Sequence, residues 1–153
     1  MMSDHDVQSA LTEVESICKQ KSIQLTPIRK LAFSLLLTAP NGLKAYELLD
    51  KIKLQKSSAT PPTAYRALDF LLEHGFAHKI SKLNTFVACK HLCHHADTPS
   101  FLLICPCCQN VTEYDNESMN HSLIDALAAS GFRLMEKEIE ITATCPGCLT
   151  LGR

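Results

Sequence analysis

The sequence predicts an α+β protein built from two small parts. Across residues 4–75, apolar residues recur at helical spacing in four stretches, and after Gly75 the period changes to the alternation typical of strands. Helices followed by a two-stranded hairpin are typical of a winged helix-turn-helix domain. Beyond residue 98, strand and helix patterns alternate around two Cys-x-x-Cys motifs, which predicts a small α/β unit. We expect the first domain over 1–88, a hinge over 89–98 and the second domain over 99–153.

Four helices are expected in the first domain, and local signals mark their ends. Thr26 is a capping residue, and Pro27 suits the first position of the helix that follows it. A polar segment with two prolines precedes the fourth helix, and Gly75 ends that helix. The segments that carry these helices are 4–20, 25–42, 44–55 and 61–75.

Short strands follow the fourth helix and recur in the second domain. Segments 76–80 and 85–89 alternate around a four-residue polar turn, which predicts a hairpin. Segments 101–105 and 110–114 are expected to pair around the turn that contains the first Cys-x-x-Cys motif. A helix over 117–131 and a long strand over 132–145 complete the α/β unit, which is small enough to need a metal or a partner chain.

The composition is that of a soluble globular protein. The chain has 153 residues, of which 46% are hydrophobic and 20% charged. Its beginning lacks the apolar segment of a secretory signal, and the longest apolar run, LAFSLLL, is far shorter than the ~20 residues that span a bilayer. We therefore expect a cytoplasmic protein that does not enter the membrane.

The charge is unevenly distributed along the chain. Residues 1–85 hold 11 basic and 8 acidic side chains, whereas residues 86–153 hold 4 and 8. Within 16–66 the balance is 9 basic to 2 acidic. A basic first half indicates a polyanionic partner for the first domain.

Cysteine spacing predicts a metal centre in the second domain. Cys105 and Cys108 form one Cys-x-x-Cys turn, and Cys145 and Cys148 form another. Two such turns supply the four thiolates of a tetrahedral zinc site. A pair of disulfides is the alternative, which a reducing compartment disfavours. Cys107, inside the first turn, is expected to face away from the metal, and Cys18, at an apolar helical position, is expected in the core.

The chain resembles the ferric uptake regulator family of metal-sensing repressors, and within it the zinc-sensing members. The resemblance rests on the two cysteine turns together with the segment PPTAYRALDFLL. It extends from about Leu11 to Cys148. It implies a homodimeric repressor that binds double-stranded operator DNA when zinc is abundant and controls zinc uptake genes. The second domain is then the dimerisation domain, stapled by zinc. An iron, manganese or peroxide sensor of the same family is the alternative.

The fourth helix is the expected DNA-reading helix. Thr63, Tyr65 and Arg66 lie in its first turns, which a helix-turn-helix presents to base edges and phosphates. Arg66 can contact guanine with two hydrogen bonds. Lys44, just before the third helix, is a candidate contact to the DNA backbone.

The resemblance also implies a second, regulatory zinc site. Family members use a histidine on the first hairpin strand, a cysteine on the second, a hinge histidine and a glutamate after the first cysteine turn. These positions are His78, Cys89, His95 and Glu113, with His94 and Asp97 as rivals of His95 and His91 behind them. Nitrogen, sulfur and oxygen donors of this kind suit tetrahedral zinc. Two zinc ions per chain are expected, one structural and one regulatory.

Enzymatic function is disfavoured by the motifs that the sequence lacks. Zinc deaminases need a His-x-Glu element, and none of the seven histidines is followed by glutamate two residues later. The chain also lacks a P-loop and the dinucleotide-binding glycine pattern. We expect neither catalysis nor a small-molecule substrate.

Overall fold

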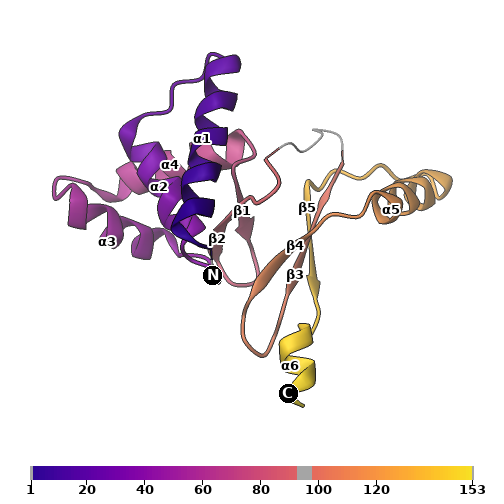
Figure 1. Cartoon of the computed structure of the whole chain (residues 1–153). Helices are drawn as coiled ribbons and strands as arrows, with labels where there is room; N and C mark the ends of the chain where they lie inside the picture. The colour runs from indigo at the N-terminus through magenta and orange to yellow at the C-terminus, as the bar shows by residue number, and fades with distance from the viewer. Residues whose placement is uncertain (1, 93–97, 153) are drawn as a thin grey trace. The chain divides into compact units, whose positions relative to one another are not determined.

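The structure of the protein is a computed structural model that describes residues 2–92 and 98–152. The chain divides into two compact units, Met1–Leu92 and Cys93–Arg153 (Figure 1). None of the helices in the described ranges has the length and apolar character needed to cross a membrane.

Over residues 2–92, which the structure describes, the first unit packs four helices around one apolar core. Thr26 caps the second helix by accepting a hydrogen bond from the backbone N–H of Arg29 at 3.4 Å, and Pro27 occupies the first turn as predicted. Phe33, Leu68 and Leu71 are among the side chains that fill the core between the helices. The four helices are α1 (Asp4–Gln20), α2 (Pro27–Leu37), α3 (Ala45–Gln55) and α4 (Pro61–Glu73).

A hairpin completes the first unit and is tied to the start of α3. Strands β1 (Ala77–Ile80) and β2 (Thr85–Ala88) pair antiparallel. Phe86 of β2 also exchanges two backbone hydrogen bonds with Leu43, at 3.0 and 2.8 Å. Gly42 makes this approach possible because it adopts a φ of +79°, and a Cβ there would lie 2.9 Å from the carbonyl oxygen of Phe86. The residues before α3 are therefore fixed against the hairpin.

In its described part, residues 98–152, the second unit is a three-stranded sheet with two helices. The strand order is β4-β3-β5, with β3 antiparallel to β4 and parallel to β5. Helix α5 lies between β4 and β5 in the chain, and the short α6 follows β5. The elements are β3 (Ser100–Ile104), β4 (Val111–Tyr114), α5 (Glu117–Ala129), β5 (Glu138–Thr142) and α6 (Pro146–Thr150).

Among the described residues of the second unit, few are buried on α5 and β5. Helix α5 buries only Asn120, and in Figure 1 it extends away from the strands. Beyond α5, Phe132 is 67% exposed and Met135 is 80% exposed. A unit that leaves this much apolar surface uncovered is consistent with the predicted need for a metal or a partner chain.

The predicted α+β fold is confirmed, and two details of the second unit were wrong. The long strand expected over 132–145 is only Glu138–Thr142, because its partner β3 begins at Ser100, whose N–H donates to the carbonyl of Lys137 at 2.9 Å. A strand extends only as far as its neighbour offers hydrogen bonds. The second cysteine turn also continues into α6, which was not predicted, with Pro146 in its first turn.

Candidate metal centres and nucleic-acid interface

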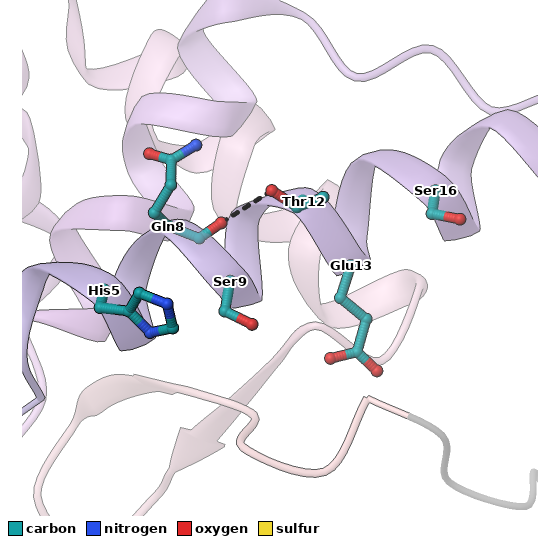
Figure 2. Close-up of a pocket in the computed structure, with 6 residues that line it drawn as sticks. All are labelled: His5, Gln8, Ser9, Thr12, Glu13 and Ser16. Atoms are coloured by element: carbon teal, nitrogen blue, oxygen red, sulfur yellow. Dashed lines mark hydrogen bonds between the residues drawn. The ribbon is translucent and has the colours of Figure 1, made fainter.

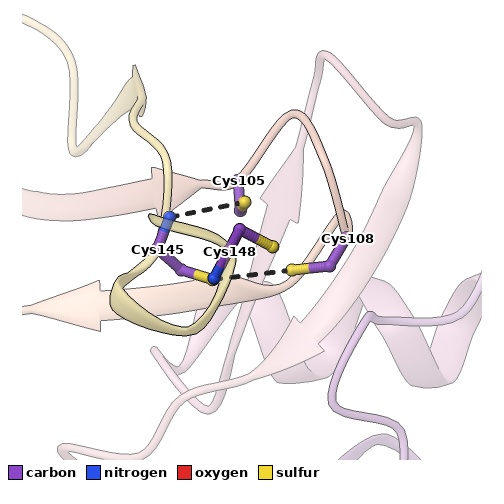
Figure 3. Close-up of side chains that lie close together, drawn as sticks. All are labelled: Cys105, Cys108, Cys145 and Cys148. Carbon is purple, nitrogen blue, oxygen red and sulfur yellow. Dashed lines mark hydrogen bonds between the residues drawn. The ribbon is translucent and has the colours of Figure 1, made fainter. Parts of the chain in front are cut away.

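Four cysteines converge at one end of the second unit. Cys105 follows β3, Cys108 closes the turn toward β4, and Cys145 and Cys148 lie at the start of α6. All four sulfur atoms lie within 4.8 Å of one another. Figure 3 shows the four side chains lying close together. The structure therefore brings together the four residues predicted for structural zinc, and all four are free thiols.

The dimensions of this cluster fit a tetrahedral zinc ion. With Zn–S bonds of about 2.3 Å, two sulfurs of a tetrahedron stand about 3.8 Å apart. The Sγ atoms of Cys108 and Cys145 are 3.8 Å apart. Cys105 and Cys148 are buried, and the other two cysteines are half-buried, so the centre is partly shielded from solvent.

Backbone hydrogen bonds prepare one of these sulfurs for a metal. The N–H of Cys145 donates to Sγ of Cys105 at 3.4 Å and, together with the backbone of Cys108, lowers the pKa of Cys105 to about 6. A lowered pKa favours the thiolate of Cys105, which is the form that binds zinc. The pKa of Cys148 is raised instead, first by its hydrogen bond with Cys145 and then by burial.

The two cysteines that were set apart from the metal lie where the sequence predicted. Cys107 is exposed, although it stands between Cys105 and Cys108 in the same turn. Cys18 is buried in the core of the first unit, and burial raises its pKa.

A second pair of metal donors lies in the hairpin of the first unit. His78 is on β1, and Cys89 directly follows β2, whose ladder it extends by donating its N–H to the carbonyl of Phe76 at 2.9 Å. The Cys89 sulfur and a His78 ring nitrogen lie within 4.8 Å of each other. Both side chains are buried, with 4% of His78 and 1% of Cys89 exposed. A buried nitrogen–sulfur pair of this kind is a partial ligand set for zinc.

Glu113 and His95 are the other two ligands predicted for the regulatory site. Glu113 lies on β4 in the second unit, opposite Leu102 of β3, and is half-buried. His95 and its rival His94 lie outside the described residues. The hinge ligand therefore stays a prediction.

Helix α4 presents two of its three predicted DNA-reading side chains to solvent. Tyr65 is 54% exposed, and Arg66 is also exposed, while Ala64, Ala67 and Leu68 face the core. Thr63 is engaged at the helix start, where its hydroxyl oxygen accepts the N–H of Thr60 at 3.1 Å.

The start of α3 carries one predicted contact and one exposed side chain that sequence reasoning missed. Lys44 precedes α3, and its N–H donates to the Glu47 carboxylate at 2.7 Å. Tyr46, two residues later, is 61% exposed. A tyrosine two residues after a lysine at a predicted helix start is the sequence signal that could have identified it as a candidate for DNA contact.

A shallow hollow along α1 offers no metal centre. In Figure 2 its polar side chains project from one face of the helix, and the Thr12 hydroxyl donates to the Gln8 carbonyl at 2.9 Å. Its volume is about 550 Å³. Among the residues that line it, only His5 and Glu13 are metal donors. They are eight residues apart, which is about 12 Å along a helix.

The chain is similar to known proteins over most of its length. The model of the ferric uptake regulator family matches residues 20–142. The chain is 37% identical over 151 residues to the zinc uptake regulation protein of Escherichia coli (strain K12). This alignment covers 97% of this chain and 86% of that protein.

Solved structures agree with this likeness. A zinc uptake regulator complexed with zinc and DNA matches with a TM-score of 0.85 at 35% identity, over 95% of this chain and 97% of that chain. The crystal structure of holo XcZur matches with a TM-score of 0.78 at 36% identity, over 93% of this chain and 98% of that chain. The winged helix-turn-helix predicted for the first unit is thereby confirmed.

Proposed function

The chain belongs to the ferric uptake regulator family of transcription regulators, and from this premise we propose that it is a zinc-responsive repressor. It binds operator DNA as a homodimer when a regulatory zinc site is filled, and it controls zinc uptake genes. This places the protein among DNA-binding regulators of the cytoplasm, without catalytic activity. The alternative metals within the family are iron and manganese.

The observation that carries this proposal is the buried pair of His78 and Cys89. The four-cysteine cluster of the second unit is closed, because four thiolates complete a tetrahedral zinc ion. A sensor needs another site whose occupancy varies. The hairpin supplies a sulfur and a nitrogen donor within 4.8 Å, and thiolate sulfur favours zinc over manganese.

We assign four ligands to the regulatory site. His78 and Cys89 provide the nitrogen and the sulfur, and the family resemblance adds Glu113 and the hinge residue His95. This gives two zinc ions per chain, the structural one being held by the four-cysteine cluster. Bound zinc supplies a tetrahedral centre that holds these donors at fixed distances.

The ligands of the regulatory site belong to segments whose arrangement matters for DNA binding. Cys89 ends the hairpin of the DNA-binding unit, whereas Glu113 belongs to a strand of the dimerisation unit. Residues that share one ion restrict how these segments move. If that restricted state is the one that binds DNA, the protein gains DNA affinity from zinc and zinc affinity from DNA by the same factor.

DNA affinity measured against free zinc tests the proposal. We expect wild-type protein to bind a selected operator duplex tightly when buffered zinc is raised, and weakly when zinc is removed by a mild chelator that spares the structural site. Iron and manganese at matched free concentrations are the controls. A response to iron or manganese in place of zinc would support the alternative sensor, and no response to any metal would overturn the proposal.

A separate prediction concerns Arg66. We expect Arg66→Ala to lower affinity for the selected operator by roughly 5- to 150-fold, because one bidentate guanine contact is worth about 1–3 kcal/mol. Binding to an unrelated duplex changes far less, as measured by fluorescence anisotropy. Zinc content and dimer formation stay at wild-type levels.

Arg66→Lys is the matched control because it keeps the charge but loses the planar fork. It is expected to retain non-specific binding and lose discrimination between the two duplexes. If Arg66→Ala kept the wild-type sequence preference, Arg66 would not be one of the residues that contact base edges.

A further inference from the structure

A small basic pocket lies between the hairpin and the starts of α3 and α4 in the first unit. Its volume is about 190 Å³. This is below the roughly 300–1,000 Å³ of pockets that hold drug-sized ligands, so it suits a single small group. Among the described residues that line it none is acidic, and the side chains that matter are Lys44, Tyr46, Tyr65, Lys79, Asn84 and Phe86.

The fold builds this pocket around Phe86. Lys79 lies opposite Phe86 in the hairpin, and its Nζ is 5.9 Å from the centre of the Phe86 ring. On the other side of β2, the two backbone hydrogen bonds between Phe86 and Leu43 place Lys44 next to the hairpin. The two lysines thus come from segments on both sides of one strand. Asn84 reaches the pocket from the hairpin turn, where its φ is 49°.

The lining groups supply hydrogen-bond donors and positive charge. Lys44 and Lys79 each carry an ammonium group, and Tyr46, Tyr65 and Asn84 add phenol and amide donors. The nearby Glu47 carboxylate accepts the N–H of Lys44 at the helix start and does not line the pocket. An anion that accepts several hydrogen bonds at once fits this set of donors.

We propose that this pocket binds one phosphate of the DNA backbone, an inference that rests on the proposed DNA-binding function. Tyr65 lines the pocket and directly precedes Arg66 on α4. A phosphate held by Lys44 and Lys79 therefore fixes the position of the reading helix along the duplex. Contacts to phosphates set register and orientation, whereas contacts to base edges carry the sequence preference.

The experiment compares the salt dependence of DNA binding in wild type, Lys79→Gln and Lys19→Gln, all loaded with zinc. The probes are a duplex selected from a random-sequence pool with the wild type and an unselected duplex of equal length. Each phosphate contact contributes about 0.9 to the slope of log affinity against log salt, so Lys79→Gln is expected to flatten that slope by about 0.9. Between about 50 and 200 mM salt the wild type then loses about 3.5-fold more affinity than this variant.

The decrease in salt slope caused by Lys79→Gln is expected to be equal for both duplexes, because a phosphate contact does not depend on the base sequence. Lys19, on α1 and outside this pocket, is the matched charge control, and its variant keeps the wild-type slope. An equal change in Lys19→Gln would reduce the effect to net charge and overturn the proposal. The zinc content and the thermal melting temperature of Lys79→Gln are expected to match wild type. If they do not, the variant has misfolded, and Lys44→Gln provides the same measurement from the other side of Phe86.

Titration of the DNA-free protein with inorganic phosphate separates a backbone phosphate from a free one. Tight binding of free phosphate that Lys79→Gln abolishes, with an unchanged DNA salt slope, would assign the pocket to a free anion and overturn the proposal. If the wild type fails to bind DNA at any zinc concentration, the proposed function itself fails. If it binds and the Lys79→Gln slope is unchanged, only the pocket assignment fails.

Discussion

Cys148→Ser is expected to remove one zinc ion per chain and leave the second unit without a stable fold. A serine hydroxyl does not replace a thiolate at a four-sulfur centre, and Cys148 is buried against the other three cysteines. Structural zinc contributes about 10–16 kcal/mol of apparent binding free energy in small zinc domains. This is as large as the total free energy of unfolding of a typical domain, which is about 5–15 kcal/mol. Metal analysis, size-exclusion chromatography and limited proteolysis measure the loss.

Cys107→Ser is the matched control because it makes the same chemical change in the first cysteine turn. Cys107 is exposed and stands between two members of the cluster. The variant is expected to keep its zinc, its dimer and its resistance to protease. Equal damage from Cys107→Ser and Cys148→Ser would contradict the assignment of the four ligands.

Cys89→Ser is expected to separate sensing from folding. The variant keeps the four-cysteine cluster, so it remains a folded dimer with about one zinc ion per chain. It no longer gains operator affinity when zinc is added. Because coupling between two sites is typically about 1–3 kcal/mol, affinity at saturating zinc is expected to fall by roughly 5- to 150-fold. Fluorescence anisotropy across buffered zinc concentrations measures this difference.

The chain offers a matched control for this variant. Cys18 is a second buried cysteine of the same unit, and it lies in the apolar core. Cys18→Ala is expected to lower stability modestly and keep the zinc response. His78→Ala is expected to behave like Cys89→Ser, and His95→Ala compared with His94→Ala identifies the hinge ligand. A normal zinc response in Cys89→Ser would place the sensing site elsewhere.

Features that depend on local spacing could be predicted from the sequence. Thr26 and Pro27 define the start of α2 through adjacent backbone groups, and the structure bears this out. The four cysteines of the cluster could be predicted equally well, since two residues between thiols suffice to aim both at one centre. The family resemblance implied the pairing of His78 with Cys89, and the short hairpin that carries both residues brings their donor atoms within 4.8 Å.

Features that depend on distant backbone pairing could not be predicted. The start of β5 is decided by where β3 begins, about 38 residues earlier in the chain, and alternation over 132–137 carries no information about that partner. The bridge between Leu43 and Phe86 likewise joins a loop to a strand 43 residues away. Without knowledge of this bridge, the sequence does not indicate that Tyr46 and Lys79 line the same pocket.

A zinc ion held by the four-cysteine cluster would also cross-link the chain. Cys145 lies 40 positions after Cys105 and 37 after Cys108, so an ion held by these residues closes a loop that contains β4, α5 and β5. Closing a loop of about 40 residues removes roughly 4 kcal/mol of chain entropy from the unfolded state in the simplest polymer treatment. A strong zinc chelator then acts on this unit as a reductant acts on a disulfide-linked domain. Removing the ion releases the loop constraint on β4, α5 and β5 in one step. This includes α5, which buries only Asn120.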